Sequence, residues 1–484
     1  MLLKPIIKNK FISTIIGSLL IYIGVAFILP LNNFSVYITS YIHLKQSSVT
    51  MHFGMFINLI FSFANSFSHP LGGYLENFLG FSKTILFGFS ILFIGNFFFI
   101  FQQNILLCYF LAIILGIGAG IGTSVIGKNL TLYSPNKKGT ISGVMGLGIL
   151  IITAIFAISG EKIIAFGGYT LQSGEQFYPK EIAERTYLYF LMGEFCIPIG
   201  LILGLIFIYE YKPEMTNQEN ILTEEIQGAT EKNNEEEKEP AIIHEEQQQE
   251  ENKNKNLDKE KSKKKILKVI KNKRYIRIAL ISLLINFSIS FMINTGRTFG
   301  ALIGINGTAL QFTAIFQALA IIIIGPILGI LVDKKGPLFI LRIVSVSSII
   351  PGIFLTFFMD ITWIFLLSFV ISVLNITGMM VSYGTFIMEV FGIQESVILG
   401  GIINGFSKVS DVITTVTAFI ISLYFQGEEL KIPYRIMYLI SAICCGISSF
   451  LLFIETNEKF KYDNIPSQSS LTKSENELVE ITHK

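Results

Sequence analysis

The sequence predicts an all-α membrane protein in which twelve transmembrane helices form two six-helix halves. Three observations lead to this prediction. The 484-residue chain is 51% hydrophobic and only 15% charged, whereas soluble globular proteins carry about 25% charged residues. Twelve apolar stretches are long enough to cross a bilayer, and a glycine–carboxylate–glycine motif occurs twice, six stretches apart.

The twelve stretches are identified by length and apolar composition. A helix needs roughly 20 mostly apolar residues to cross a hydrocarbon core of about 30 Å, because it rises about 1.5 Å per residue. Stretches of this kind occur near residues 11–38, 50–72, 84–102, 105–127, 139–160, 187–210, 275–298, 308–332, 338–358, 362–387, 397–424 and 433–454. The narrowest break, at 101–104, separates the third stretch from the fourth.

The first stretch follows several lysines and so resembles a signal peptide. It continues past Pro30, and no small-residue cleavage pattern follows it. We therefore interpret it as the first membrane helix, with a cleaved signal as the alternative.

Lysine and arginine in the short loops predict the orientation of the helices. If the N-terminus is cytoplasmic, the cytoplasmic loops contain Lys83, Lys137, Lys138, Lys334, Lys335 and Arg342. The outer loops are poorer in these residues, as the positive-inside rule requires. Both termini are therefore expected in the cytoplasm. The sequence does not indicate which membrane holds the protein.

Composition divides the chain into four parts. Residues 1–210 and 274–455 are the predicted six-helix halves, and 456–484 form a polar cytoplasmic tail. Residues 211–273 are rich in Glu, Lys, Asn and Gln, and such a segment cannot bury enough apolar surface to offset its ordering entropy. We predict a disordered linker there. Its basic end could contact anionic lipid headgroups, or it could only fix the topology.

The repeated motif relates the two halves. It ends the second stretch as Gly72, Glu76 and Gly80, and it ends the eighth as Gly329, Asp333, Lys334 and Gly336. Six stretches separate the copies, so both halves have the same orientation and are related by an axis along the membrane normal. Glycine allows helices to approach closely, and a carboxylate there can face the positive N-terminus of a neighbouring helix. We predict that these loops form gates, with Asp333 bonded to the start of the eleventh stretch or to a nearby base.

Residues 329–336 closely resemble the loop signature of the major facilitator superfamily, Gly-x-Leu-x-Asp-Lys/Arg-x-Gly. The first copy departs from it, with Glu76 for Asp, Asn77 for the base and one additional residue before Gly80. Residues 133–143, with an aromatic residue, a proline, a basic pair and glycines, are similar to the oxalate/formate antiporter and monocarboxylate porter branch.

The fourth stretch is also similar to that branch in being rich in glycine. Its regularly spaced members are Gly116, Gly118, Gly120 and Gly122. By themselves these glycines indicate only tight helix packing. The resemblance as a whole implies a major facilitator fold and transport of organic anions by alternating access.

Polar groups in the eleventh stretch are the first candidates for a binding site, because an ionisable group at bilayer depth costs about 2.5–3.5 kcal/mol on insertion scales. Lys408 is near the middle of this stretch, Asp411 follows at i+3, and Asn404 precedes at i−4. All three share one helical face. In the branch a lysine in this helix meets the substrate carboxylate, so the resemblance implies that role for Lys408. The alternative is a purely structural ion pair between Lys408 and Asp411.

Other polar residues are weaker candidates, each with a structural alternative. Arg297, near the outer end of the seventh stretch, could line the substrate path or extend to the interface. Glu194 could carry a proton or hydrogen-bond between helices. Asn32 and Asn33 could face the cavity or cap a helix. Tyr383 could donate its hydroxyl to the cavity or pack against its neighbours.

Taken together, the residues predict a secondary transporter of small organic solutes, with monocarboxylate-like anions as the expected substrates. The alternatives are an uncharged or zwitterionic solute, or a membrane sensor that does not transport. The branch often has an arginine just before the second loop motif, where this chain has Gly325-Pro326, so a dicarboxylate is less expected.

No P-loop, H-E-x-x-H or Gly-x-Ser-x-Gly motif is present, so we expect neither an enzyme nor a cofactor. The four cysteines lie in apolar stretches without metal-ligand spacing. The expected partners are a small-molecule substrate, protons or a counter-anion, and membrane lipid. Nucleic acid is not expected, and we predict a monomer.

Overall fold

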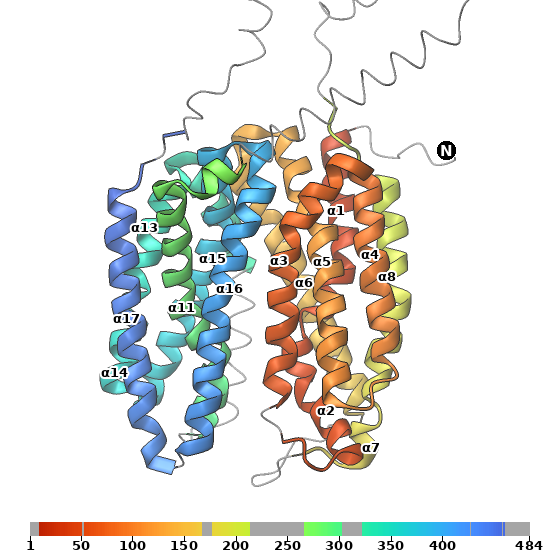
Figure 1. The fold of residues 1–484 in the computed structure, drawn as a ribbon, viewed down its shortest axis with the longest axis vertical. Helices are drawn as coiled ribbons and strands as arrows, with labels where there is room; N and C mark the ends of the chain where they lie inside the picture. Colours follow the sequence, from red (N-terminus) through yellow and green to blue (C-terminus); the bar gives the residue numbers. More distant parts are fainter. Residues whose placement is uncertain are drawn as a thin grey trace, which may run out of the picture.

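The computed structural model describes residues 9–50, 53–166, 177–212, 266–302, 322–425, 427–456 and 458–459. In these ranges the chain is a bundle of helices (Figure 1). Ten of the described helical stretches are long and apolar enough to cross a membrane. The prediction of an all-α membrane protein is confirmed.

The first half of the chain contains eight α-helices in the described ranges. They are α1 (Lys10–Ile28), α2 (Leu31–Lys45), α3 (Gly54–Leu79), α4 (Phe81–Phe99), α5 (Ile105–Tyr133), α6 (Lys138–Ile164), α7 (Lys180–Ala183) and α8 (Thr186–Phe207). The predicted break at 101–104 is confirmed: Asn104 caps α5 by accepting a hydrogen bond from the Leu107 backbone nitrogen at 2.7 Å. The first predicted stretch is interrupted at Pro30, which separates α1 from α2 and lacks the N–H that a continuous helix needs.

The second half of the chain is also helical in the described ranges. Its helices are α11 (Lys273–Leu302), residues 322–335, α13 (Pro337–Ser347), α14 (Ile349–Phe358), α15 (Thr362–Phe391), α16 (Ile393–Tyr424) and α17 (Lys431–Ile454). The ninth predicted stretch is divided at Ser348, shortly before Pro351. The first part of the eighth predicted stretch and most of the predicted linker lie outside the described residues. Residues 266–270, at the end of that linker, are helical, and Val269 is buried in the core of the second half.

The bundle has two distinguishable ends. We call the end at which α1 begins and α17 ends the termini face (Figure 1). Three short loops on this face turn at glycines with positive φ: Gly80 at 81°, Gly336 at 86° and Gly392 at 88°. Their ψ values of 168°, 152° and 156° place them in a region that is essentially restricted to glycine and costs other residues about 1–3 kcal/mol, which explains the glycines at these tight connections.

The buried apolar residues form separate cores in the two halves. One core draws its buried members from residues 21–208, and two others draw theirs from residues 269–452. Many large apolar side chains on the outside of the bundle remain exposed, among them Phe195 and Phe450. A surface of this kind is suited to a lipid environment rather than to water.

The four glycines in α5 face two different helices in alternation. A Cβ atom on Gly116 or Gly120 would collide with α3, whereas one on Gly118 or Gly122 would collide with α4. Every second residue of a helix lies roughly on the opposite side, so the spacing places α5 between two closely packed neighbours. These glycines shape the helix bundle.

This packing gives a stability prediction. A Cβ on Gly118 would lie 2.8 Å from the Gly88 carbonyl oxygen, so Gly118→Ala should lower the free energy of unfolding by about 1–3 kcal/mol through overpacking. Gly127, in the same helix, has no atom within 4 Å of its added Cβ, and Gly127→Ala is the matched control. Thermal unfolding in detergent should show a lower midpoint for Gly118→Ala only. Equal midpoints in the two variants would contradict the packing.

Candidate functional site

The two halves meet along α3 with α16 and along α6 with residues 322–335 and α15. Near the termini face the approach is close. An added Cβ on either Gly139 or Gly329 would lie 2.6 Å from the carbonyl oxygen of the other. One turn further along α6, a Cβ on Gly143 would lie 2.8 Å from the Gly325 carbonyl oxygen. Small residues therefore bring the backbones of the two halves together at this end.

Asp333 joins the halves at this contact. Its Oδ1 accepts a hydrogen bond from the Gly139 backbone nitrogen at 2.7 Å, and its Oδ2 accepts two from Thr140, from the nitrogen at 2.8 Å and from Oγ1 at 2.5 Å. The carboxylate thus caps the N-terminus of α6, where free N–H groups and the helix dipole favour negative charge. The predicted partner, the start of the eleventh stretch, is wrong. Residues 322–335 pack against α6, so their loop reaches that helix instead.

The first loop makes a different contact. Glu76 forms an ion pair with Lys128 of α5 at 2.9 Å, inside its own half, and the two side chains are 15% and 11% exposed. Gly72 also faces α5, whereas Gly73 faces Val397 of α16 across the halves. Glu76 therefore stabilises the first half and does not cap a helix of the second.

This difference corrects the alignment of the two motif copies. Gly80 and Gly336 have the same positive-φ conformation, and alignment on them matches Gly73 with Gly329 and Asn77 with Asp333. The carboxylate of the first copy is then displaced by one residue, which is about 100° around a helix. Asn77, at the matching position, is exposed, as is Lys334 in the second copy. Only the second copy places a carboxylate between the halves.

The polar residues of α16 connect it to two neighbours. Lys408 Nζ donates to Asp411 Oδ2 at 2.8 Å, and the Lys408 side chain is 29% exposed. The other oxygen of Asp411 accepts a short hydrogen bond from Ser290 of α11, and Asp411 is 6% exposed. Asn404, one turn before Lys408, donates to Ser66 of α3 at 3.5 Å. Lys408 thus lies between a buried carboxylate in its own half and a residue that contacts the other half.

Sequence reasoning identified Lys408, Asp411 and Asn404 but missed the two serines. Ser290 and Ser66 belong to helices far away in the chain, and serine is common in membrane helices. Nothing in the local sequence distinguishes them from serines that bond to their own helix, such as Ser372.

A family model described as Major Facilitator Superfamily matches residues 14–415. The chain belongs to the major facilitator superfamily. No curated protein sequence matches it.

Solved structures of the superfamily share the fold at low sequence identity. The proton:xylose symporter XylE has a TM-score of 0.64 and 14% identity, with 92% of this chain and 94% of that chain covered. FucP, described in its outward conformation, has a TM-score of 0.59 and 13% identity, with coverages of 93% and 100%. The human organic anion transporter MFSD10 has a TM-score of 0.55 and 13% identity, with the same coverages. At these identities the likeness concerns the fold alone.

The remaining candidates occupy separate places in this major facilitator bundle. The Tyr383 hydroxyl donates to the Ile278 carbonyl of α11 at 3.1 Å, which corresponds to the packing alternative. Glu194 accepts a hydrogen bond from Asn96 of α4 at 2.5 Å, so it connects α8 to α4. The side chains of Arg297, Asn32 and Asn33 lie outside the described residues. Among the residues described, no group of three or more His, Cys, Asp or Glu could hold a metal ion.

Proposed function

We propose that this chain is a secondary transporter of small organic anions, with monocarboxylates as the simplest substrates, and that Lys408 binds the substrate carboxylate. The observation that carries the proposal is the position of Lys408. It is the cation of a half-buried ion pair in α16, one turn from the Asn404–Ser66 contact between the halves. An anion bound there would touch both halves, which is where alternating access requires the substrate to sit.

Substrate binding would exchange one carboxylate for another at Lys408. A substrate carboxylate would make the same kind of charge-assisted hydrogen bond with Lys408 that Asp411 makes, so an incoming anion can compete with Asp411. The displaced Asp411 would retain Ser290 as a partner but would be a buried carboxylate without a cation. A buried carboxylate without a cation costs free energy, which a co-transported cation would offset. We therefore infer that anion and proton move together.

The contact between Asp333 and the start of α6 would close the termini face, which we take to be cytoplasmic. The relatives allow this function without requiring it. XylE is described as a proton:xylose symporter and MFSD10 as an organic anion transporter. The same fold therefore serves neutral and anionic substrates, and the side chains of the binding site must distinguish them.

A transporter of neutral solutes is the second candidate. Asp411 already neutralises Lys408 at 2.8 Å, so the pair presents no net charge to a ligand. If Lys408 and Asp411 stay paired, their surroundings would favour a ligand with hydroxyl groups over a ligand with a carboxylate.

A solute panel on purified protein in liposomes tests the proposal. We expect saturable uptake of pyruvate and formate, faster when the outside is more acidic, and uptake of oxalate or xylose no greater than in empty liposomes. The pH dependence follows from the proposed movement of the anion together with a proton. Xylose uptake without pyruvate uptake would favour the neutral-solute candidate and contradict the anion proposal.

A further inference from the structure

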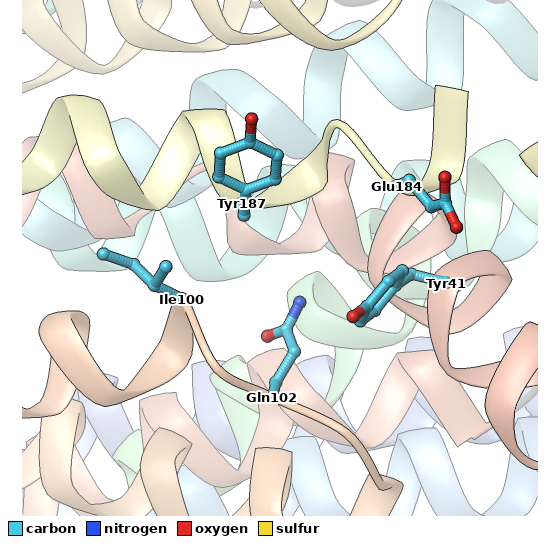
Figure 2. A pocket seen from close by; sticks show the side chains of 5 residues that line it. All are labelled: Tyr41, Ile100, Gln102, Glu184 and Tyr187. Carbon is cyan, nitrogen blue, oxygen red and sulfur yellow. The ribbon is translucent and has the colours of Figure 1, made fainter. Parts of the chain in front are cut away.

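A small pocket lies on the face opposite to the termini face, away from the contact between the halves. It is lined by Tyr41 at the end of α2, Ile100 and Gln102 after α4, and Glu184 and Tyr187 at the start of α8 (Figure 2). Its volume is about 100 Å³. None of these residues takes part in the proposed transport site.

Two hydrogen-bond donors point into this pocket. Figure 2 shows the Gln102 amide and the Tyr41 hydroxyl directed into the space between the five side chains. Gln102 is only 2% exposed, and its Oε1 accepts from the Cys108 thiol at 3.8 Å. In the part of the chain that the structure describes, the Gln102 amide nitrogen has no hydrogen-bond partner. This nitrogen faces the open pocket, so a ligand with an acceptor oxygen can receive a hydrogen bond from it.

The rim of the pocket favours a positive charge. Glu184 is paired only loosely, with Lys180 at 3.8 Å, and both side chains are well exposed. The rings of Tyr41 and Tyr187 flank the space, and aromatic faces attract cations. Lys45, whose Nζ lies 5.9 Å from the centre of the Tyr41 ring, adds a cation near the donors. The pocket therefore suits a ligand with an ammonium at one end and an anionic oxygen at the other.

An apolar surface continues from the pocket along the outside of the bundle. On α8, Tyr187 is followed at i+4 and i+8 by Leu191 and Phe195, which are exposed. On α4 and just after it, Phe97 and Phe101 are also exposed. Residues four apart share one helical face, so these side chains form a strip that acyl chains can cover.

We propose that the pocket binds the headgroup of an ethanolamine phospholipid. The ammonium meets Glu184 at the rim, and a phosphate oxygen accepts hydrogen bonds from Gln102 and Tyr41. The acyl chains lie on the strip formed by α4 and α8. A choline headgroup fits less well, because its quaternary ammonium has no N–H to donate to Glu184. A glycerol headgroup lacks the cation.

Native mass spectrometry of the purified full chain tests this site. The protein is mixed with equal amounts of ethanolamine, choline and glycerol phospholipids that carry identical acyl chains. We expect about tenfold greater retention of the ethanolamine lipid, the effect of one charge-assisted hydrogen bond. Glu184→Gln should reduce the preference to about twofold or less, and Gln102→Ala should weaken retention of that lipid.

Glu181→Gln is the matched control, because Glu181 is an exposed glutamate in α7, the short helix that Glu184 directly follows, and does not line the pocket. It should retain the wild-type preference. Unchanged thermal unfolding of Glu184→Gln without lipid would show that the variant is folded. The proposal is overturned if Glu184→Gln keeps the preference, if the three lipids bind equally, or if soluble phosphoethanolamine binds as tightly as the lipid. The last result would assign the pocket to a free zwitterion.

Discussion

Replacing Lys408 with glutamine is expected to abolish carboxylate transport in proteoliposomes, lowering the rate by about 100-fold or more. Truncating one partner of a buried, hydrogen-bonded charge pair costs about 2–5 kcal/mol, which corresponds to a factor of about 30 to several thousand. Glutamine also leaves Asp411, which is 6% exposed, without its cation. The substrate then loses its charged partner.

Two further variants separate this role from a general effect on folding. Lys431 pairs with Asp360 at 2.9 Å on the face opposite to the termini face, and Lys431→Gln should transport pyruvate at close to the wild-type rate. Asp411→Asn should still bind the anion, because Lys408 is then free to receive it, but uptake should lose its dependence on the pH gradient. Wild-type pyruvate uptake by Lys408→Gln would rule out the role assigned to this lysine.

Replacing Asp333 with asparagine should open the termini face. The carboxylate accepts three hydrogen bonds from Gly139 and Thr140, and an asparagine would turn its NH₂ group towards N–H donors or lose one of these bonds. Hydrogen bonds to charged groups contribute about 1.5–3 kcal/mol each, so the closed state should lose about 10-fold to 100-fold in population. Spin labels placed on the two halves at this face should report longer distances. Carboxylate affinity should change by only a few fold.

Glu76→Gln provides the comparison for Asp333→Asn. Glu76 pairs with Lys128 within the first half, so its replacement should lower thermal stability without altering the distances between the halves. If both variants show the same distance distributions as the wild type, Asp333 has no role in closing this face.

The fold could be predicted from the sequence because membrane helices have a length and composition that few other structures share. The break at 101–104 shows how well local signals can place helix ends. The interruption at Pro30 was not predicted, because the first stretch was expected to continue past that proline. The stretch at 50–72 was also predicted, although the helix found there, α3, is not among the ten that are apolar enough by composition to cross a membrane. It packs between α5 and α16, where neighbouring helices shield its polar side chains.

Contacts in the candidate site could be predicted only between residues of the same helix. The i+3 spacing of Lys408 and Asp411 indicates an ion pair without knowledge of any other helix. The partners of Asp333 and Asp411 depend on which helices are neighbours, and that information is absent from a local pattern. The register of the first loop motif was uncertain by one residue, because the adjacent Gly72 and Gly73 match the pattern equally well. The role of Arg297 stays a prediction.

The most direct test of the central claim is calorimetric titration of purified protein with pyruvate and with xylose, performed on the wild type and on Lys408→Gln. We expect the wild type to bind pyruvate and not xylose, and Lys408→Gln to bind neither. Binding of xylose by the wild type, or equal binding of pyruvate by both proteins, would contradict an anion site at Lys408.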